Sequence, residues 1–440
     1  MHFISTQGGS PPATLAEALR LGLAPDGGLY VPERLEPLPR EFFDGLPGRP
    51  WSETTTRVAR HLLGPAFDPM GLEGAVLDRL VTEALDFPIP LVRVEERLHV
   101  LELFHGPTLA FKDVGARFLA RLLAVTQEDH GKGGEPATVL VATSGDTGGA
   151  VAQAFHGVEG TRVVILYPHG KVTVLQERQF TTLGGNVHAF AVDGTFDDCQ
   201  RLVKACFANA GLHRRLRLTS ANSINIGRLL PQIFYYFHAV AQLPADTKPL
   251  FVTPSGNFGN LTAGLLAKAL GLDASFVAAT NANDVVPSYL ETGLFEPRPS
   301  LRTVSNAMDV GNPSNFDRIL HLYDGDIDAL RRDLVGRRYD DDATCQAIRD
   351  VDAEHGYLLD PHTAVGYLAA KDVLPGRSAD TVAVVLGTAH PAKFRETVEP
   401  AIGREIHIPS ALSERLDLDV KSVPLDNDLE ALEAALGALD

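Results

Sequence analysis

The sequence predicts an α/β fold in which mostly parallel strands alternate with helices. From about residue 95, short apolar runs rich in β-branched residues alternate with helical stretches, a spacing typical of βαβ units covered on both faces. The first ninety or so residues lack this rhythm and are expected to form a separate, helical unit. Seven runs are expected to be strands: residues 98–103, 137–142, 161–167, 187–192, 249–253, 275–280 and 381–386.

The N-terminal unit is expected to contain three helices. The first is predicted by apolar residues at helical spacing: Leu15, Ala18, Leu19 and Leu23. Two more are expected around residues 52–63 and 72–86, separated from the first by a turn and an extended stretch over residues 24–32. The prolines of residues 87–90 mark a boundary. At the other end of the chain, residues 429–436 show helical spacing and predict a final helix.

Composition excludes several classes of function. The 440 residues are 45% hydrophobic and 22% charged, as in ordinary globular proteins, and carry a formal net charge of −17. This charge argues against nucleic-acid and anionic-membrane partners. No apolar run reaches transmembrane length, and the first residues do not resemble a secretory signal, so a cytoplasmic protein is expected. Three cysteines without metal-type spacing predict buried thiols, and no histidine pair has zinc-site spacing, so no metal is expected.

Lys112 is unusual because the chain otherwise prefers arginine. The sequence has 30 arginines and nine lysines, and Lys112 is the first lysine in it. Its neighbours Leu109, Ala110, Phe111 and Val114 are apolar. Desolvation favours the neutral amine, which can form a Schiff base with a carbonyl, whereas arginine cannot. The alternative is a lysine whose stem lies on an apolar surface with its amine in water.

Three predicted strands end in the same way, in a turn of small residues that opens a helix. These turns follow the strands near residues 142, 253 and 386. Such a turn directs backbone N–H groups and the positive end of a helix to one place. The three turns therefore predict anion-binding positions at the carboxyl edge of a parallel sheet.

The second turn is the best candidate for a phosphate cradle. It comprises Ser255, Gly256, Asn257, Phe258, Gly259 and Asn260. Its glycines permit close approach of the backbone, and its side chains add hydrogen-bond donors. Because it lacks the lysine of a nucleotide-binding P-loop, it suits a phosphate that stays bound. A tight turn without a ligand is the alternative.

Two other polar segments could hold anions. The first turn has hydroxyls and amides suited to a carboxylate and comprises Thr143, Ser144, Gly145, Asp146 and Thr147. A serine hydrolase is disfavoured, since Ser144 is not in a nucleophile elbow and has no identifiable histidine partner. The second segment offers Asn222, Ser223 and Arg228, which could grip a phosphate; the alternative is a helix capped by Asn222 or Ser223 with Arg228 in solvent.

Together these motifs resemble the threonine synthase family, a group of fold-type-II pyridoxal-phosphate enzymes. The matching segments are residues 104–113, 143–149, 255–260 and 387–394. Residues 5–6 and 21–32 resemble the long bacterial and fungal branch of that family. The resemblance extends from Ile4 to about Phe394.

The resemblance implies a role for each motif. Lys112 would hold pyridoxal 5′-phosphate and then act as the mobile base. Residues 255–260 would bind the cofactor phosphate, and Thr388 would face the pyridine nitrogen. Residues 143–147 would take the substrate carboxylate, and Asp146 would reach the cofactor's phenolic oxygen. Asn222, Ser223 and Arg228 would bind the phosphate of O-phospho-L-homoserine, which the enzyme would convert with water to L-threonine and phosphate.

The resemblance also implies a fold similar to the tryptophan synthase β subunit. We expect an N-terminal unit (1–94), a large α/β domain (95–128 and 216–440) and a small α/β domain (129–215), with the cofactor between the last two. A monomer or a weak homodimer is expected. Two other functions remain open: a lyase that eliminates phosphate and yields 2-oxobutyrate, and a non-catalytic anion-binding protein on the same fold.

Overall fold

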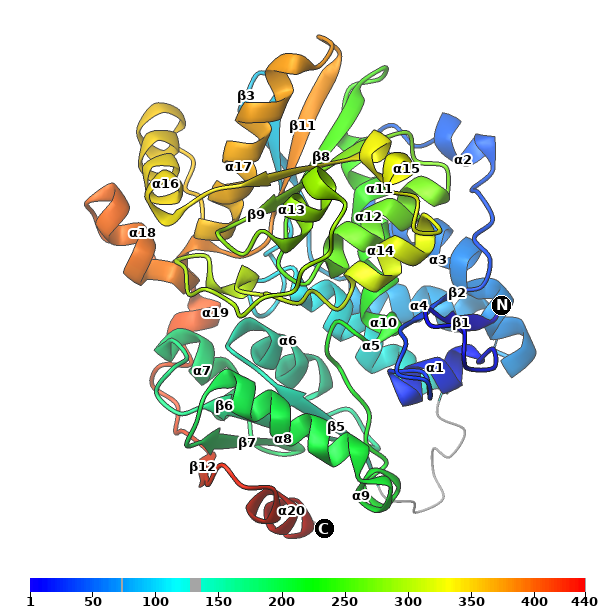
Figure 1. The fold of residues 1–440 in the computed structure, drawn as a ribbon, viewed down its shortest axis with the longest axis vertical. Coiled ribbons are helices and arrows are strands. Elements are labelled where there is room, and N and C mark those ends of the chain that lie inside the picture. Colours follow the sequence, from blue (N-terminus) through cyan, green and yellow to red (C-terminus); the bar gives the residue numbers. More distant parts are fainter. Residues whose placement is uncertain (73, 127–135, 440) are drawn as a thin grey trace.

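In the residues that the structure describes, 1–72, 74–126 and 136–439, the chain forms sheets of six, four and two strands (Figure 1). The coordinates are a computed structural model. Its strands are β1 (Phe3–Ser5), β2 (Tyr30–Pro32), β3 (Leu91–Glu95), β4 (Leu98–Glu102), β5 (Ala137–Ala142), β6 (Thr161–Pro168), β7 (Val187–Val192), β8 (Lys248–Pro254), β9 (Ser275–Thr280), β10 (Leu334–Arg338), β11 (Thr381–Gly387) and β12 (Ser422–Leu425).

Helices connect and cover these strands. The α-helices are α1 (Leu15–Leu21), α2 (Arg40–Asp44), α3 (Trp51–Phe67), α4 (Gly74–Ala84), α5 (Lys112–Thr126), α6 (Asp146–Phe155), α7 (Val174–Thr181), α8 (Phe196–Ala208), α9 (Ala210–Arg215), α10 (Ile226–Leu229), α11 (Gln232–Gln242), α12 (Gly259–Ala269), α13 (Val285–Thr292), α14 (Phe316–Leu322), α15 (Ile327–Asp333), α16 (Asp341–His355), α17 (Pro361–Val373), α18 (Arg395–Ile402), α19 (Ser410–Ser413) and α20 (Leu429–Gly437). Short 3₁₀ helices are η1 (Asp68–Met70), η2 (Asn306–Met308), η3 (Leu374–Gly376) and η4 (Pro391–Phe394).

The larger sheet has the strand order β10-β9-β8-β11-β4-β3 within the described residues. Its strands are parallel except β3, which is antiparallel to β4. The carboxyl ends of β4, β8 and β11 therefore lie at one edge. The loops beyond these ends lead to Lys112, to the turn 255–260 and to Thr388. Ligands of open α/β sheets bind at this edge.

Both faces of the larger sheet are buried, as expected for parallel strands. Leu250 and Val252 of β8 pack with α16, α17 and α18 in one core cluster, while Phe251 faces the opposite cluster, which contains α5, α11 and α12. Because successive side chains of a strand point to opposite faces, the near-continuous apolar run of β8 is explained by two covered faces.

The smaller sheet has the order β12-β7-β6-β5 in the described part of the chain, and all its pairs are parallel. The strand β12 pairs with β7 although it lies within the range 216–440, which we had assigned to the large domain. Leu432 and Leu436 of α20 pack in the same cluster as Cys199 and Cys206 of α8. The end of the chain therefore belongs to the smaller sheet, where its apolar helix face is buried. The expected boundary at residues 128–129 lies outside the described residues, and the other domain limits stay predictions.

The N-terminal unit is mainly helical, as predicted, but also contains the antiparallel pair β1–β2, whose strands are connected through α1. The helix α1 is capped by Thr14 and Glu17 and ends before Gly22, whose φ is 71°. The prediction that Leu23 belongs to the first helical face is wrong, because the chain leaves the helix at this glycine. Leu23 is instead exposed and bridges to Leu29.

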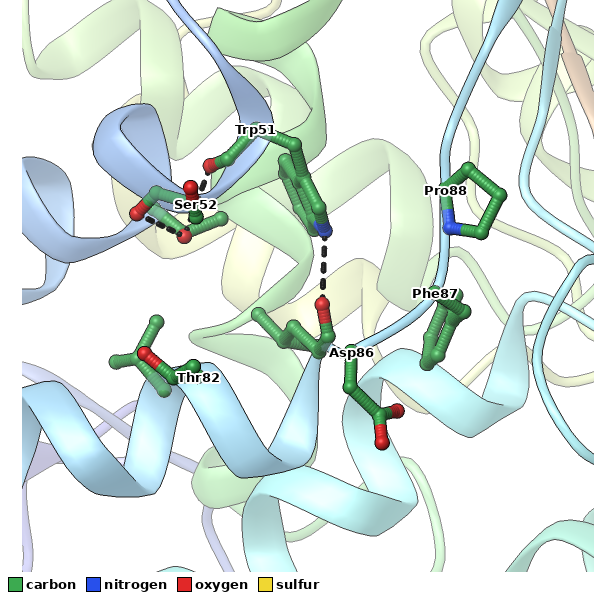
Figure 2. A pocket seen from close by; sticks show the side chains of 9 residues that line it. Trp51, Ser52, Thr82, Asp86, Phe87 and Pro88 are labelled. Atoms are coloured by element: carbon green, nitrogen blue, oxygen red, sulfur yellow. Dashed lines mark hydrogen bonds between the residues drawn. The ribbon is translucent and has the colours of Figure 1, made fainter.

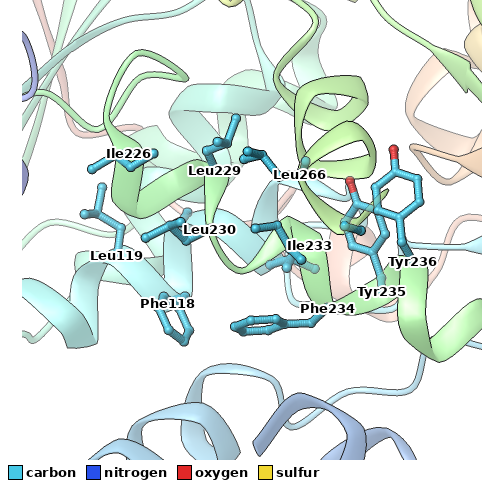
Figure 3. Packing of buried hydrophobic residues seen from close by; sticks show 14 of the residues in the cluster. Phe118, Leu119, Ile226, Leu229, Leu230, Ile233, Phe234, Tyr235, Tyr236 and Leu266 are labelled. Carbon is cyan, nitrogen blue, oxygen red and sulfur yellow. The ribbon is translucent and has the colours of Figure 1, made fainter. Parts of the chain in front are cut away.

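The helix α5, which starts at Lys112, packs closely against α10 (Figure 3). A Cβ on Gly115 would lie 2.6 Å from the Arg228 carbonyl oxygen, and a Cβ on Gly227 would lie 2.7 Å from Leu119. Both glycines are therefore required for the crossing. Farther along, Phe118 and Phe234 pack edge to face, with ring centroids 5.7 Å apart. This packing places Arg228 beside the start of α5.

All seven predicted strands are present, with ends shifted by one residue at most. The strands β1, β2, β3, β10 and β12 were not among the seven predicted runs, although β2 lies within residues 24–32, where a turn and an extended stretch were expected. Each is only three to five residues long, and β3, β10 and β12 lie at sheet edges. In the described residues, no helix is both long and apolar enough to cross a membrane.

Candidate active site

The loop before Lys112 is fixed to the loop after β11. Ala110 forms an antiparallel bridge with Ala389, and the Phe111 N–H donates to the Thr388 carbonyl at 2.9 Å. Leu109 adopts a positive φ of 56° where the chain turns. Backbone hydrogen bonds thus bring together Lys112 and Thr388, which are far apart in the sequence.

Asp113 closes the same loop from inside. Its carboxylate accepts the Thr108 N–H at 2.8 Å and the Thr108 hydroxyl at 2.7 Å. The side chain is fully buried, and this burial raises the pKa of Asp113 to about 6, although the bonds from Thr108 oppose the shift. A Cβ on Gly106 would come within 2.5 Å of this carboxylate. Asp113 therefore shapes the loop that precedes α5.

Lys112 is held in a low-polarity environment but keeps part of its surface accessible. Burial lowers the pKa of its amine from 10.5 to about 8. The carboxylate of Asp146 opposes this shift, and the positive charges of Lys393 and Arg228 add to it. An amine with this pKa is partly neutral near neutral pH, as a nucleophile or base requires.

Lys393, which sequence reasoning missed, is buried next to the candidate site. It is fully buried, lies 2.7 Å from Asp146 Oδ1 and donates to the Thr108 carbonyl at 2.7 Å. The signal that singled out Lys112, a lysine in a chain rich in arginine, also applied to Lys393. It joins three segments: η4, the lysine loop and the start of α6.

Asp146 is the buried anion of this cluster. Gln176 Nε2 of α7 donates to its Oδ1 at 2.9 Å. Burial alone would raise its pKa, but Lys393, followed by Lys112, holds the pKa of Asp146 well below its usual value. Asp146 therefore stays ionised and compensates part of the positive charge of the two lysines. Its predicted contact with the cofactor's phenolic oxygen stays a prediction.

The turn 143–147 presents few free hydroxyls. Thr143 is buried, and its Oγ1 accepts the N–H groups of Gly145 and Gly148 at 3.0 and 2.8 Å. Its hydroxyl thus organises the turn. Ser144 is exposed and Thr147 is half-buried, so these two keep hydroxyls that a ligand can reach. Gly145 is needed at φ 145°, where a Cβ would also meet Gln176.

The turn 255–260 is arranged as a cradle of backbone donors. Among the described residues, no acceptor pairs with the N–H groups of Gly256, Asn257, Gly259 and Asn260. Ser255 and Asn260 bond to each other, and the Phe258 N–H donates to Ser255 Oγ at 3.1 Å, with Phe258 at φ 59°. The side chains thus hold the turn open, and the free N–H groups at the start of α12 fit an anion.

A buried chain of contacts supports the cradle from behind. The Ala307 N–H donates to His362 Nε2 at 3.2 Å, and His362 Nδ1 lies 2.7 Å from Asp360 Oδ1. This fixes η2, and the backbone of Met308 in η2 presses on Gly256, where a Cβ would approach to 2.6 Å. His362 therefore supports the cradle.

The segment that contains Asn222, Ser223 and Arg228 contacts the cradle. Asn257 Nδ2 donates to Ser223 Oγ at 2.6 Å. The alternative in which Asn222 or Ser223 caps the following helix is wrong, because Asn225 accepts the Gly227 N–H and caps it. Asn225 is the residue suited to this role, since its amide also donates to two carbonyl groups in the buried interior. Ser223 is thus free to face the cradle.

Arg228 lies inside the protein, contrary to the alternative that put it in solvent. It is 4% exposed, and burial lowers its pKa to about 10. Its Nη1 donates to the Ala221 carbonyl, and its Nε has no partner among the described residues. Within the same residues no carboxylate forms an ion pair with it. Asp113 offsets only part of the cost of burying this charge. A buried guanidinium without an ion-pair partner fits a site that receives an anion.

Arg318 was missed by sequence reasoning and joins three parts of the molecule. It is 1% exposed and donates to the carbonyl groups of Tyr30, Ser223 and Ile224 at 3.0, 3.2 and 2.7 Å. Burial lowers its pKa to about 9. The N-terminal unit is thereby bonded directly to the segment beside the cradle. No local pattern in the sequence distinguishes this arginine from the others.

A separate pocket of about 320 Å³ lies between α3 and α4 (Figure 2). The indole N–H of Trp51 donates to the Leu85 carbonyl at its edge, at 3.1 Å. None of the predicted site residues lines it. Its lining residues are Trp51, Ser52, Thr55, Val81, Thr82, Leu85, Asp86, Phe87 and Pro88.

The fold and the lysine opposite a phosphate cradle define a pyridoxal-phosphate enzyme, and comparison supports this class. The family model described as pyridoxal-phosphate dependent enzyme matches residues 85–388. The models for the threonine synthase N terminus and C-terminal region match residues 2–78 and 363–436. The chain therefore belongs to the threonine synthase family.

Individual relatives agree over nearly the full length. The chain is 45% identical to threonine synthase of Serratia marcescens, covering 93% of this chain and 92% of the relative. The threonine synthase of Escherichia coli K12 is 46% identical, with 95% of each chain covered. The crystal structure of the Escherichia coli enzyme gives a TM-score of 0.90 at 44% identity, covering 100% of both chains. A pyridoxal-phosphate-bound threonine synthase from Brucella melitensis gives 0.92 at 38% identity, covering 99% of this chain and 98% of that one.

The residues present fit pyridoxal phosphate. The cradle offers unpaired N–H groups for a phosphate, and Lys112 offers an amine with lowered pKa for an aldehyde. Thr388 is buried beside the lysine loop, and its hydroxyl has no hydrogen-bond partner among the described residues, which suits a contact with a ring nitrogen. In the part of the chain described here, no group of three His, Cys, Asp or Glu residues that could hold a metal ion occurs.

Proposed function

We propose that this chain converts O-phospho-L-homoserine and water to L-threonine and phosphate, as its family name implies. The observation that carries the proposal is the pairing of Lys112, whose pKa is lowered to about 8, with a cradle of unpaired backbone donors on the same sheet edge. The first element suits reversible bonding to an aldehyde, and the second suits a phosphate that remains bound.

Lys112 acts as the base and the acid of the reaction. Bound pyridoxal phosphate supplies an aldehyde for amines and a ring that takes up the charge of a deprotonated carbon. The neutral Lys112 amine removes the proton at Cα of the substrate, and the charged form returns protons later. A pKa of about 8 allows both forms near neutral pH.

The remaining site residues bind and orient the substrate. Ser144, Gly145 and Thr147 at the start of α6 hold the carboxylate, where the helix's positive end favours an anion. Asn222, Ser223 and Arg228 hold the substrate phosphate, which leaves from Cγ. Thr143 and Asp146 position these groups, since their side chains are already engaged within the protein.

Product analysis tests the proposal against its alternatives. The purified protein supplied with O-phospho-L-homoserine should release phosphate and threonine in equal amounts. Release of 2-oxobutyrate and ammonia in place of threonine would favour the phospho-lyase, which needs the same residues but adds no water at Cβ. A protein that retains no cofactor and releases no phosphate would favour the anion-binding alternative.

The substrate phosphate site is tested separately with Arg228→Ala. We expect a KM for O-phospho-L-homoserine at least ~10-fold higher, because a charged hydrogen bond to the phosphate is lost. Cofactor absorbance should be unchanged. The control Arg34→Ala removes an exposed guanidinium and should leave KM unchanged. An unchanged KM in Arg228→Ala would move the phosphate site elsewhere.

We also propose that the protein acts in the cytoplasm as a monomer or weak homodimer, without nucleic-acid or membrane partners. The net charge of −17 supports the last point. Sedimentation of the purified protein across a range of concentrations measures the oligomeric state. A stable higher oligomer would contradict it.

A further inference from the structure

Asn315 carries a buried amide group without a partner. It is 0% exposed, and its Nδ2 has no hydrogen-bond partner among the described residues. Leaving a buried donor unpaired destabilises the folded chain. Such a group is expected where a ligand completes its hydrogen bonding.

The orientation of this amide is settled by Arg318. Asn315 Oδ1 accepts from Arg318 Nη1 at 2.6 Å. A guanidinium can only donate, so the oxygen of the amide must face it and the NH₂ group must face away. The same guanidinium donates to the carbonyl groups of Ser223 and Ile224, which fixes it in place.

The NH₂ group faces the start of α12. A Cβ built on Gly259 would lie 3.5 Å from Asn315 Nδ2 and 3.7 Å from the Cβ of Ser223, with no closer neighbour. Gly259 also carries one of the unpaired N–H groups of the cradle. Asn257 fastens this arrangement, because its Oδ1 accepts the N–H and hydroxyl of Ser314 at 2.7 and 2.9 Å.

We propose that Asn315 is a further phosphate-binding residue, whose Nδ2 donates to an anion at the Gly259 end of the cradle and whose orientation is set by Arg318. This deepens the proposed function and rests on it. The anion is a phosphate monoester, either that of the cofactor or that of the substrate. Neutral donors suit such a site because they bind the anion without titrating themselves.

The test is Asn315→Asp, which keeps the size and the bond from Arg318 but replaces the donor with an acceptor. The matched control is Asn312→Asp, an exposed position in the same loop that gains the same charge. Three quantities are measured on the full chain: the affinity for pyridoxal phosphate after removal and return of the cofactor, the KM for O-phospho-L-homoserine, and the melting temperature with and without inorganic phosphate.

We expect at least a ~10-fold loss in one affinity in Asn315→Asp and less than about 2-fold in the control. Weaker cofactor binding with a smaller phosphate-induced rise in melting temperature assigns the donor to the cofactor phosphate. A raised KM with unchanged cofactor affinity assigns it to the substrate phosphate. Unchanged affinities and an unchanged response to phosphate would overturn the proposal.

A second variant covers the case in which Asn315→Asp does not fold. Gly259→Ala leaves Asn315 intact but puts a methyl group into the space before its Nδ2, so it should weaken the same ligand. Full affinity for both ligands in Gly259→Ala would overturn the proposal. A wild-type chain that binds both phosphates but forms no threonine would refute the proposed function and leave the role of Asn315 standing.

Discussion

The two sides of the candidate site differ in the kind of polar group that faces the ligand. Around Lys112, buried charges of both signs lie together: Asp146 raises the pKa of Lys112, Lys393 and Arg228 lower it, and the two lysines lower the pKa of Asp146. Around Gly256, the groups facing the site are neutral N–H and amide donors, which are held by hydrogen bonds and do not titrate near neutral pH. A group that must gain and lose protons needs tunable charge, whereas a phosphate that stays bound needs fixed dipoles.

The largest expected effect comes from removing the titrating group itself. Lys112→Ala should lose the yellow cofactor colour and reduce turnover by at least ~10³-fold, because no other described group offers an amine at this position. Absorbance and threonine release measure both effects. The control Lys371→Ala removes an exposed lysine paired with Glu95 and should retain colour and turnover. Full activity in Lys112→Ala would refute the assignment.

The next largest effect is expected from breaking the buried ion pair between Asp146 and Lys393. Asp146→Asn should lower the free energy of unfolding by about 3–5 kcal/mol, since Lys393 would remain buried without its carboxylate. Urea denaturation at pH 7 measures the loss. In Asp372→Asn, which breaks an exposed pair with Arg337, the loss should stay below about 1 kcal/mol. If the free energy of unfolding fell equally in the two variants, the buried pair would contribute no more to stability than the exposed one.

The cradle should respond to shape more than to charge. Gly256→Ala places a Cβ 2.6 Å from the Met308 backbone and should weaken cofactor binding at least ~10-fold, because the turn or η2 must move. The loss should be the same at pH 7 and pH 9, since no titrating group is involved. Fluorescence titration with pyridoxal phosphate measures it. If Gly256→Ala weakened cofactor binding at only one of the two pH values, a titrating group would act in the cradle. That result would contradict the contrast drawn between the cradle and the surroundings of Lys112.

The smallest effect is a shift of the pH profile. Activity should rise with pH as Lys112 loses its proton, with an apparent pKa of about 8. In Lys393→Met the positive charge that lowers this pKa is gone, and Asp146, which raises it, is no longer paired. Both changes move the rise in activity to higher pH, by up to about one unit.

The dependence of kcat/KM on pH measures this shift. Lys371→Met, at an exposed position, should leave the profile unchanged. A shift to lower pH in Lys393→Met would contradict the electrostatic account.

The central strands of the two larger sheets were easier to predict from the sequence than the short strands at the sheet edges. The central strands are continuous apolar runs, so their positions follow from composition alone. The short edge strand β12 has little apolar pattern of its own, and its pairing with β7 depends on the burial of α20. For this reason the end of the chain was expected in the wrong unit.

The candidate site was predictable only where its chemistry is local. The turn 255–260 and Lys112 have recognisable neighbours in the sequence. Lys393, Asn315 and Arg318 obtain their roles from contacts with residues more than ninety positions away, or from burial that only the folded chain creates. No spacing rule identifies such residues in a single sequence.

The bond from Arg318 to the Tyr30 carbonyl has a consequence for how this enzyme can be divided. A chain cut near residue 88 would keep every residue proposed to touch cofactor or substrate. It would nevertheless lose one of the carbonyl acceptors of a deeply buried guanidinium that also orients Asn315 and Ser223. The N-terminal ninety residues therefore help to hold Arg318 in place, and the remaining domains transplanted without them should have a less rigid phosphate-binding region.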